Sequence, residues 1–406
     1  MFKQVKRLAA VAGVAAVAAA VAVTGPAAGV ASARVLGSSG IQPGLSPVAW
    51  NGTDLVTAAV GANGTLYAYE QVPGASSWQR QTIETQARNG GAALGAPSVA
   101  ATATSVQVVA EDANGRIWFY QQADGQSTWS APQLVAQVSV GQVVLAQQPK
   151  IAWTGVPGHA GTNSVITIAN AAGDVLFWYQ SGTGWGHETV AAPAQSVGWG
   201  APDLTATSTG IVIAAVGTNG AFYTWFQPYG GPAWASDGTL GASAGQFWGP
   251  PALTWNGADV TAVAAFTDGT GITLRFAWKA GSAQFWSQET LPGVTDAQYL
   301  SSDPAITWTG SNLLVTAVQQ LTSDKQRLDF WWQGTAFTTF NRETAAAANY
   351  PDAFGPPALT YDPASPGEAM ITAPFTTNAF HTTTALDDWT QPTAGTTWTR
   401  HQINAP

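Results

Sequence analysis

Apolar and polar positions along the chain follow one pattern that recurs seven times. Each copy holds a short segment led by Pro, a β-branched and Ala-rich segment such as 56–61, a Gly-containing turn, an aromatic segment such as 176–179, and a further aromatic after a second turn. Apolar runs of this length between turn residues predict short β-strands. The copies lie about 52 residues apart, which is typical of a repeat architecture. The pattern therefore predicts seven units of four antiparallel strands each.

Two kinds of residue mark the units and keep the same order throughout. A Pro leads the first strand of each unit: Pro47, Pro97, Pro149, Pro202, Pro251, Pro304 and Pro357. An aromatic follows the second turn: Trp78, Trp129, Trp185, Trp234, Trp286, Phe340 and Trp398. A fixed order of landmarks over the whole chain indicates one repeated structural unit.

The aromatic strand indicates how the units pack. In the unit that contains Trp185, Val175, Phe177 and Tyr179 point to one side of the strand, and Leu176 and Trp178 to the other. Both faces are apolar, whereas a two-layer sandwich needs only one apolar face and alternates. Sheets stacked around an axis bury both faces. The predicted fold is all-β, a seven-bladed β-propeller of four-stranded antiparallel blades.

Turn chemistry and side-chain size refine this fold. Asn63-Gly64, Asn114-Gly115 and Asn219-Gly220 separate the second and third strands, and predict type I′ hairpin turns. Blades converge toward the axis, so the small residues of the second strand place it near the centre. The Pro-led strand has two possible places, innermost in its own blade or outermost in the preceding one, because Pro favours strand starts and edges. In the second case 47–50 would join the last blade.

The first 33 residues match a secretory signal. Lys3, Lys6 and Arg7 precede an Ala/Val run, and Ala31-Ser32-Ala33 forms a small-residue cleavage site. The apolar run is shorter than the ~20 residues of a spanning helix, so an uncleaved anchor is the weaker alternative. We expect a signal peptide at 1–33, an N-terminal linker at 34–43 and a single propeller domain at 44–406. The mature protein would be secreted and extracellular.

Composition limits the possible partners. The chain has no Cys, 9% charged residues, 14 Lys+Arg and a net charge of −9. Nucleic acids and anionic membranes are bound through basic patches, so neither is the expected partner. The four His are dispersed, and the sequence shows no His pair at metal-ligand spacing and no acidic Ca²⁺ loop, so we expect no metal site and no cofactor.

The order Pro-x-aliphatic-x-Trp, small strand, aromatic strand and Gly-x-x-Trp resembles the bacterial seven-bladed propeller lectins of the PLL-like, fucose-binding type. The resemblance spans roughly 44–404 and concerns the architecture. Those lectins carry an Arg-Gly-Thr-Asp-like element and an Ala-Leu-Trp-His-like strand, where this chain has 62–65 (ANGT) and 66–69 (LYAY), without the Arg and the His. The resemblance implies repeated sites at blade junctions, and no sugar-binding residue is transferred from the family.

An enzyme is the less favoured alternative, because two carboxylates suffice for glycoside hydrolysis. Glu188, Glu289 and Glu343, with Asp237, repeat at one position of their units, which suits a structural or binding role. The acids that break the repeat are Glu70, Glu111 and Asp112, for which solvated surface is the favoured interpretation. The elbow-like 241–245 (GASAG) lacks the strand-turn-helix context of a nucleophile, so we expect no catalytic residues.

Aromatics in the Gly-containing loops between units are the candidate binding residues. They are Trp199, Trp248, Tyr299 and Phe354, each a few residues before a repeat Pro. An exposed ring there would stack on a pyranose while nearby polar groups bind its hydroxyls. The alternative is that these rings plug the blade junctions. The sequence thus predicts a non-catalytic, lectin-like protein that binds glycans at shallow junction sites. The alternatives are a protein-interaction scaffold and, less favoured, a glycoside hydrolase.

Overall fold

The computed structural model describes a chain built from β-strands. The described residues lie within Arg34–Pro406, which forms one structural unit. They are 48–403 except for 52, 62, 73–76, 86–88, 91–93, 103, 138–147, 156–162, 171–172, 192–198, 232, 241–244, 270, 281–284, 295–298, 301, 324, 334–338, 350–351, 363–367, 377–383 and 393–396. The predicted signal peptide and linker lie outside the described residues and stay predictions. Among the described residues no helix is long and apolar enough to span a membrane.

Seven antiparallel sheets make up the described part, and each follows the chain without a crossover. The strands of the first four blades are β1 (Val48–Trp50), β2 (Leu55–Val60), β3 (Leu66–Gln71) and β4 (Gln79–Glu84); β5 (Ser98–Ala101), β6 (Ser105–Glu111), β7 (Arg116–Ala123) and β8 (Gln133–Gln137); β9 (Lys150–Trp153), β10 (Ser164–Ala169), β11 (Val175–Ser181) and β12 (Gly184–Ala191); and β13 (Asp203–Ala206), β14 (Gly210–Val216), β15 (Phe222–Pro228) and β16 (Ala235–Leu240).

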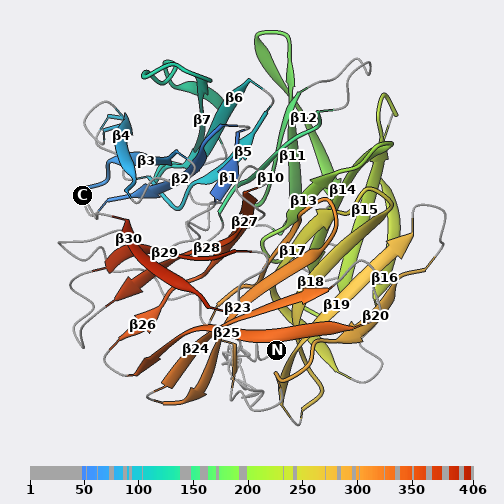
Figure 1. Cartoon of the computed structure of the whole chain (residues 1–406). Coiled ribbons are helices and arrows are strands. Elements are labelled where there is room, and N and C mark those ends of the chain that lie inside the picture. The colour runs from blue at the N-terminus through green and yellow to red at the C-terminus, as the bar shows by residue number, and fades with distance from the viewer. Residues whose placement is uncertain are drawn as a thin grey trace, which may run out of the picture. The chain divides into compact units, whose positions relative to one another are not determined.

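The last three blades repeat this plan with longer strands. They are β17 (Gln246–Trp255), β18 (Asp259–Thr267), β19 (Ile272–Ala280) and β20 (Ser287–Thr290); β21 (Tyr299–Leu300), β22 (Ala305–Trp308), β23 (Leu313–Thr322), β24 (Lys325–Gln333) and β25 (Phe340–Asn349); and β26 (Ala353–Phe354), β27 (Ala358–Asp362), β28 (Glu368–Thr376), β29 (Thr384–Pro392) and β30 (Thr399–Ile403). The short β21 and β26 pair beside β22 and β27 on the same neighbour, so each is a detached piece of the first strand. The predicted seven-bladed β-propeller of four-stranded blades is confirmed (Figure 1).

The Pro-led strands are innermost and close the ring. Each contacts the corresponding strand of the next blade, from β1 through β5, β9, β13, β17 and β22 to β27, which contacts β1. Hydrogen bonds join some of these neighbours, such as the Leu253 backbone N–H, which donates to Asp203 Oδ2 at 2.7 Å. β1 pairs with β2 of its own blade. Every blade is therefore one continuous segment, and of the two places considered for the Pro-led strand the structure has the innermost one.

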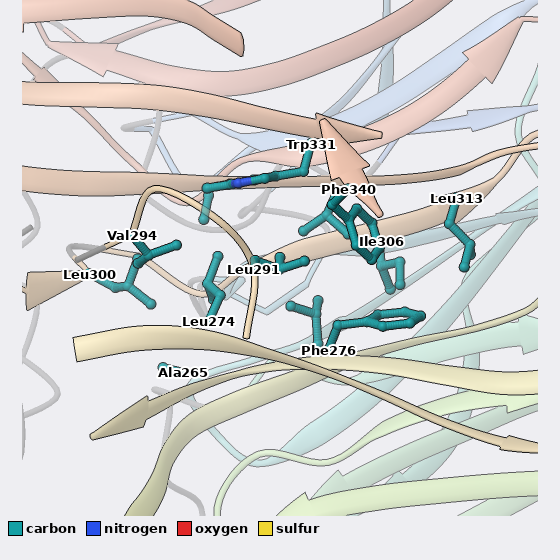
Figure 2. Close-up of a cluster of buried hydrophobic side chains, with 13 residues drawn as sticks. Ala265, Leu274, Phe276, Leu291, Val294, Leu300, Ile306, Leu313, Trp331 and Phe340 are labelled. Atoms are coloured by element: carbon teal, nitrogen blue, oxygen red, sulfur yellow. The ribbon is translucent and has the colours of Figure 1, made fainter. Parts of the chain in front are cut away.

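Burial explains the two apolar faces of the central strands. Every residue of β2, β6, β10 and β14 is buried, whereas at least half of the residues in the outer β4 and β20 are exposed. Trp178, in the third strand of its blade, is 4% exposed. Between blades 5 and 6, Leu274 and Phe276 of β19 meet Ile306 and Trp331 of blade 6 (Figure 2). Each blade thus completes the core of its neighbours.

The repeated outer-strand aromatics pack on the preceding blade. Trp234 meets Phe177 edge to face, with ring centroids 4.9 Å apart. The same contact recurs as Trp185 on Phe119, Trp286 on Phe222, Phe340 on Phe276 and Trp398 on Phe330. At the closing junction the Trp78 indole N–H donates to Asp388 Oδ1 of blade 7 at 3.1 Å. The landmark aromatics therefore join adjacent blades, including the last to the first.

The Asn-Gly turns differ from the predicted type I′. The backbone N–H of Gly115 donates to the Asp112 carbonyl, and that of Asp112 to the Arg116 carbonyl. The turn is therefore centred one residue earlier, and Gly115 follows it with φ 74°. The same pair of bonds occurs at Gly64 and Gly220. These are three-residue loops in which only the Gly must adopt the left-handed conformation.

Candidate functional site

The loop aromatics belong to a position that repeats from blade to blade. In five blades, a residue at or just ahead of the start of the innermost strand pairs with the end of the second strand. These residues are Leu94, Trp199, Phe247, Leu300 and Phe354, and all five are buried. Leu occupies the place in two blades, so the position is part of the core rather than a binding surface.

Trp199 and Phe354 are therefore packed inside the protein. Trp199 is 8% exposed and its ring lies edge to face on Tyr223 and Trp225. Phe354 is 6% exposed and packs against Phe375 of its own blade. Neither ring offers a free face to a sugar, so their burial favours the plug alternative. Their carbohydrate-binding role stays an untested prediction, as does that of Tyr299, whose side chain lies outside the described residues.

Trp248 lies one position later in its unit than its spacing from the repeat Pro indicated. The extra Pro in Pro250-Pro251 shifts the spacing by one residue, and Phe247 takes the buried place, paired with Phe266. The structural counterparts of Trp248 are the glycines that follow Leu94, Trp199 and Phe354. Blade 5 thus carries an indole where three other blades have no side chain.

The surroundings of Trp248 are those of a shallow site. Its ring is half-buried and packs on the apolar cluster between blades 5 and 6. The next residue, Gly249, is exposed with φ 70°. Asp303, on the segment that leads into β22, places Oδ1 3.4 Å from where a Cβ on Gly249 would lie. An aromatic face beside a carboxylate, with a bare backbone between them, can bind both the apolar and the hydroxyl groups of a pyranose.

Of the three acids that break the repeat, Glu111 and Asp112 are buried, which corrects the expectation that they form solvated surface. Asp112 is fully buried; its Oδ1 accepts the backbone N–H groups of Asn114 and Arg116, and its Oδ2 accepts from Arg116 Nε at 2.7 Å. Glu111 is 3% exposed, and burial, together with the charge of Asp112, raises its pKa to about 8. Glu70 is half-buried, and its Oε2 accepts a 2.7 Å hydrogen bond from Gln81.

The repeated outer-strand acids link neighbouring blades. Glu188 accepts a 2.8 Å hydrogen bond from Gln227 of the next blade, and Glu343 accepts one of 2.6 Å from Gln391. Asp237 forms an ion pair with Lys279 of the next blade. These contacts agree with the predicted structural role. Among the described residues no group of three His, Asp or Glu side chains is placed to hold a metal ion, and Ser243 of the elbow-like segment lies outside those residues.

A cluster that the sequence analysis did not select lies on blade 6. Arg327 Nε and Arg342 Nη2 both donate to Oδ2 of the buried Asp329, at 2.8 and 3.1 Å. Thr344 donates to Asp329 Oδ1 at 3.0 Å. Gln319, fully buried on the adjacent strand, accepts a 3.1 Å hydrogen bond from Arg327. The signal for this cluster was the run 325–329 (KQRLD), which places charges at alternate positions of the third strand.

Comparisons with known proteins support the fold but do not identify a ligand. No family model and no curated protein matches the sequence. A solved ulvan lyase, a polysaccharide lyase, matches with a TM-score of 0.56 and 10% identity over 83% of this chain and 92% of that one. The fucose-specific lectin from Aleuria aurantia matches with a TM-score of 0.47 and 14% identity, over 77% and 96%. The lectin SapL1, in complex with alpha methyl fucoside, gives 0.45 and 12%, over 76% and 95%.

The likeness to the lyase agrees with the propeller architecture that the sequence predicted. At these identities the likeness to the lyase shows the fold alone, and the two lectin matches add no argument about a ligand.

Proposed function

We propose that this protein is a secreted, carbohydrate-binding propeller with shallow sites at its blade junctions. The best supported site is the junction of blades 5 and 6. The observation that carries the proposal is Trp248, a half-buried indole that replaces glycine and is followed by Gly249, beside which the carboxylate of Asp303 lies. Secretion is proposed from the N-terminal segment 1–33 alone.

The chemistry of this junction suits a sugar better than a protein partner. A pyranose presents a small apolar face with hydroxyls at its rim, which one indole and one carboxylate can match. A protein interface of standard size needs roughly 800 Å² per partner, with several aromatic anchors. Trp248 is a single ring in a Gly-flanked loop, so a small, shallow ligand is favoured over a protein.

A glycan array with the Trp248→Ala variant tests the proposal. The wild-type protein is expected to bind a defined set of glycans, and the variant to lose that binding while its melting temperature falls less than on truncation of a buried ring, because the indole is only half-buried. Phe247→Ala, one residue earlier, is the matched control; it should lower the melting temperature, since that ring is buried. Unchanged glycan binding by a folded Trp248→Ala protein would refute the site.

A polysaccharide-cleaving enzyme is the second candidate, favoured by one observation. With a pKa of about 8, Glu111 is protonated at neutral pH, as a general acid must be. Its side chain, however, lies within the junction of blades 2 and 3 rather than on the surface. Release of reducing or unsaturated ends from polysaccharides, abolished in Glu111→Gln, would establish this candidate.

A further inference from the structure

We propose that Gln319, Arg327 and Arg342 form an anion subsite, which binds the carboxylate or sulfate group of an acidic saccharide at the junction of blades 5 and 6. This inference rests on the proposed function, because it names the class of saccharide for the same junction. The three residues lie on three adjacent strands of blade 6, β23, β24 and β25.

The cluster faces the same junction as Trp248. Arg327 and Asp329 share a face of β24 with Trp331, because side chains two residues apart point to the same side. Trp331 belongs to the apolar cluster between blades 5 and 6 (Figure 2). Trp248 packs against this cluster. Arg342 donates to the Gly293 carbonyl on the segment that connects the two blades. The cations therefore face the same junction as the proposed sugar site.

The charge of the cluster is positive in an acidic protein. Two guanidinium groups share one carboxylate, and both oxygens of Asp329 are engaged. Each Arg side chain keeps 18% of its surface exposed. Lys325, exposed two residues before Arg327, adds a third cation on the same face. Guanidinium groups bind carboxylate and sulfate oxygens through several N–H donors at once.

Gln319 supplies an unused donor beside these cations. Its Oε1 accepts from Arg327, so the orientation of its amide is fixed, because the flipped amide would place two donors against each other. Its Nε2 is buried and has no hydrogen-bond partner within the described part of the chain. A buried N–H without an acceptor is costly, and an anion's oxygen is one acceptor that would satisfy it.

The carboxylate of Asp303 indicates where the acidic group of the saccharide lies. Asp303 lies beside Gly249, next to Trp248, and its carboxylate repels an anion there. The acidic group of the saccharide therefore lies toward Arg327 and Arg342, while its apolar face meets Trp248. An oligosaccharide that has a charged group on one side and an uncharged, apolar face on the other could bind both the guanidinium groups and Trp248.

Three polymers test the inference at physiological salt, where long-range attraction is largely screened. They are polygalacturonate, which carries carboxylates, dextran sulfate, which carries sulfates, and neutral dextran. We expect one or both acidic polymers to bind at least tenfold more tightly than dextran, and the stronger of the two identifies the anion. Binding of dextran alone, or equal binding of all three, would overturn the acidic preference and leave the proposed function intact. Failure of the glycan array and of all three polymers would overturn both.

The variant that isolates the subsite is Gln319→Glu. It keeps an oxygen for Arg327 and replaces the free N–H donor with a negative charge, so the acidic preference is expected to fall at least tenfold. Arg327→Gln should act in the same direction, and near-ultraviolet dichroism checks that both variants fold. Arg400→Gln is the matched control, because Arg400 pairs with Asp387 at the equivalent place of blade 7, where one cation balances one carboxylate. An acidic preference that survives in folded Gln319→Glu and Arg327→Gln would overturn the subsite.

Discussion

The raised pKa of the buried Glu111 carboxyl predicts that the free energy of unfolding depends strongly on pH. Its carboxyl is 3% exposed at the end of β6, and burial is the first cause of its raised pKa, with the charge of Asp112 second. The pKa in the folded protein is about 8, against an ordinary value of 4.5. One pKa unit corresponds to about 1.36 kcal/mol, so ionisation of this group costs the folded state about 5 kcal/mol.

The sign follows from which state binds the proton more tightly. Between the ordinary value and the raised one, the folded protein holds a proton that the unfolded chain has released. Stability from this group is therefore fully present below pH 4.5, declines as pH rises, and is lost above pH 8. Glu111→Gln keeps the shape and cannot ionise, so the variant should lack this decline and be the more stable protein at pH 9.

Urea unfolding of both proteins at pH 5 and pH 9 measures the effect. The wild-type protein is expected to lose about 4 kcal/mol more than Glu111→Gln over that interval, because at pH 5 the unfolded carboxyl is already mostly ionised. Other carboxyls with a raised pKa, such as Glu70, are present in both proteins and cancel in the comparison. Glu343→Gln, in a different junction, is the control for the exchange itself. Equal pH slopes for wild type and Glu111→Gln would refute the assignment of a buried, protonated carboxyl.

Three further predictions concern the blades and their closure. Trp178→Ala should cost about 3 to 5 kcal/mol by calorimetry, because the ring is buried within the central part of its blade; a loss under 1 kcal/mol would contradict that packing. A chain that ends at Pro356 should lose the cooperative fold and its near-ultraviolet dichroism, since β27 joins β22 to β1; a soluble, native-like six-blade fragment would oppose a closed ring. Asp388→Ala should cost about 3 kcal/mol in urea unfolding, because it strips Trp78 Nε1 and His401 Nδ1 of a buried acceptor; a change within 0.5 kcal/mol would show that the closing contact is unimportant.

The fold could be predicted because all seven units show the same pattern of strands with apolar residues to be buried. A strand such as β11 is apolar on both faces, which only sheets stacked on both sides satisfy, and the landmark aromatics gave the number of units. Whether the Pro-led strand was inner or outer could not be decided from the sequence, because Pro is compatible with both places. The contact of β27 with β1 decides it.

The site could be predicted only in part, because single positions depend on register. The spacing from the repeat Pro grouped Trp248 with Trp199, but Pro250-Pro251 shifts blade 5 by one residue, and one residue reverses the side to which a strand side chain points. The acids posed a different problem. The sequence alone suggests a surface position for Asp112. The structure shows that its carboxylate accepts the backbone N–H groups of its own turn.

Function in a repeat fold is to be sought where a blade departs from the others. Residues that recur, such as Trp234 on Phe177 or Glu188 with Gln227, are accounted for by the contacts between blades. Trp248 stands where other blades have glycine, and Gln319 retains a buried donor that packing does not use. Trp248 packs on the apolar cluster of its junction, but three other blades are built without a side chain at that place, and Gln319 faces the same junction. Two departures from the repeat in one junction set the junction of blades 5 and 6 apart from the other blade contacts. Binding of a ligand there would account for both.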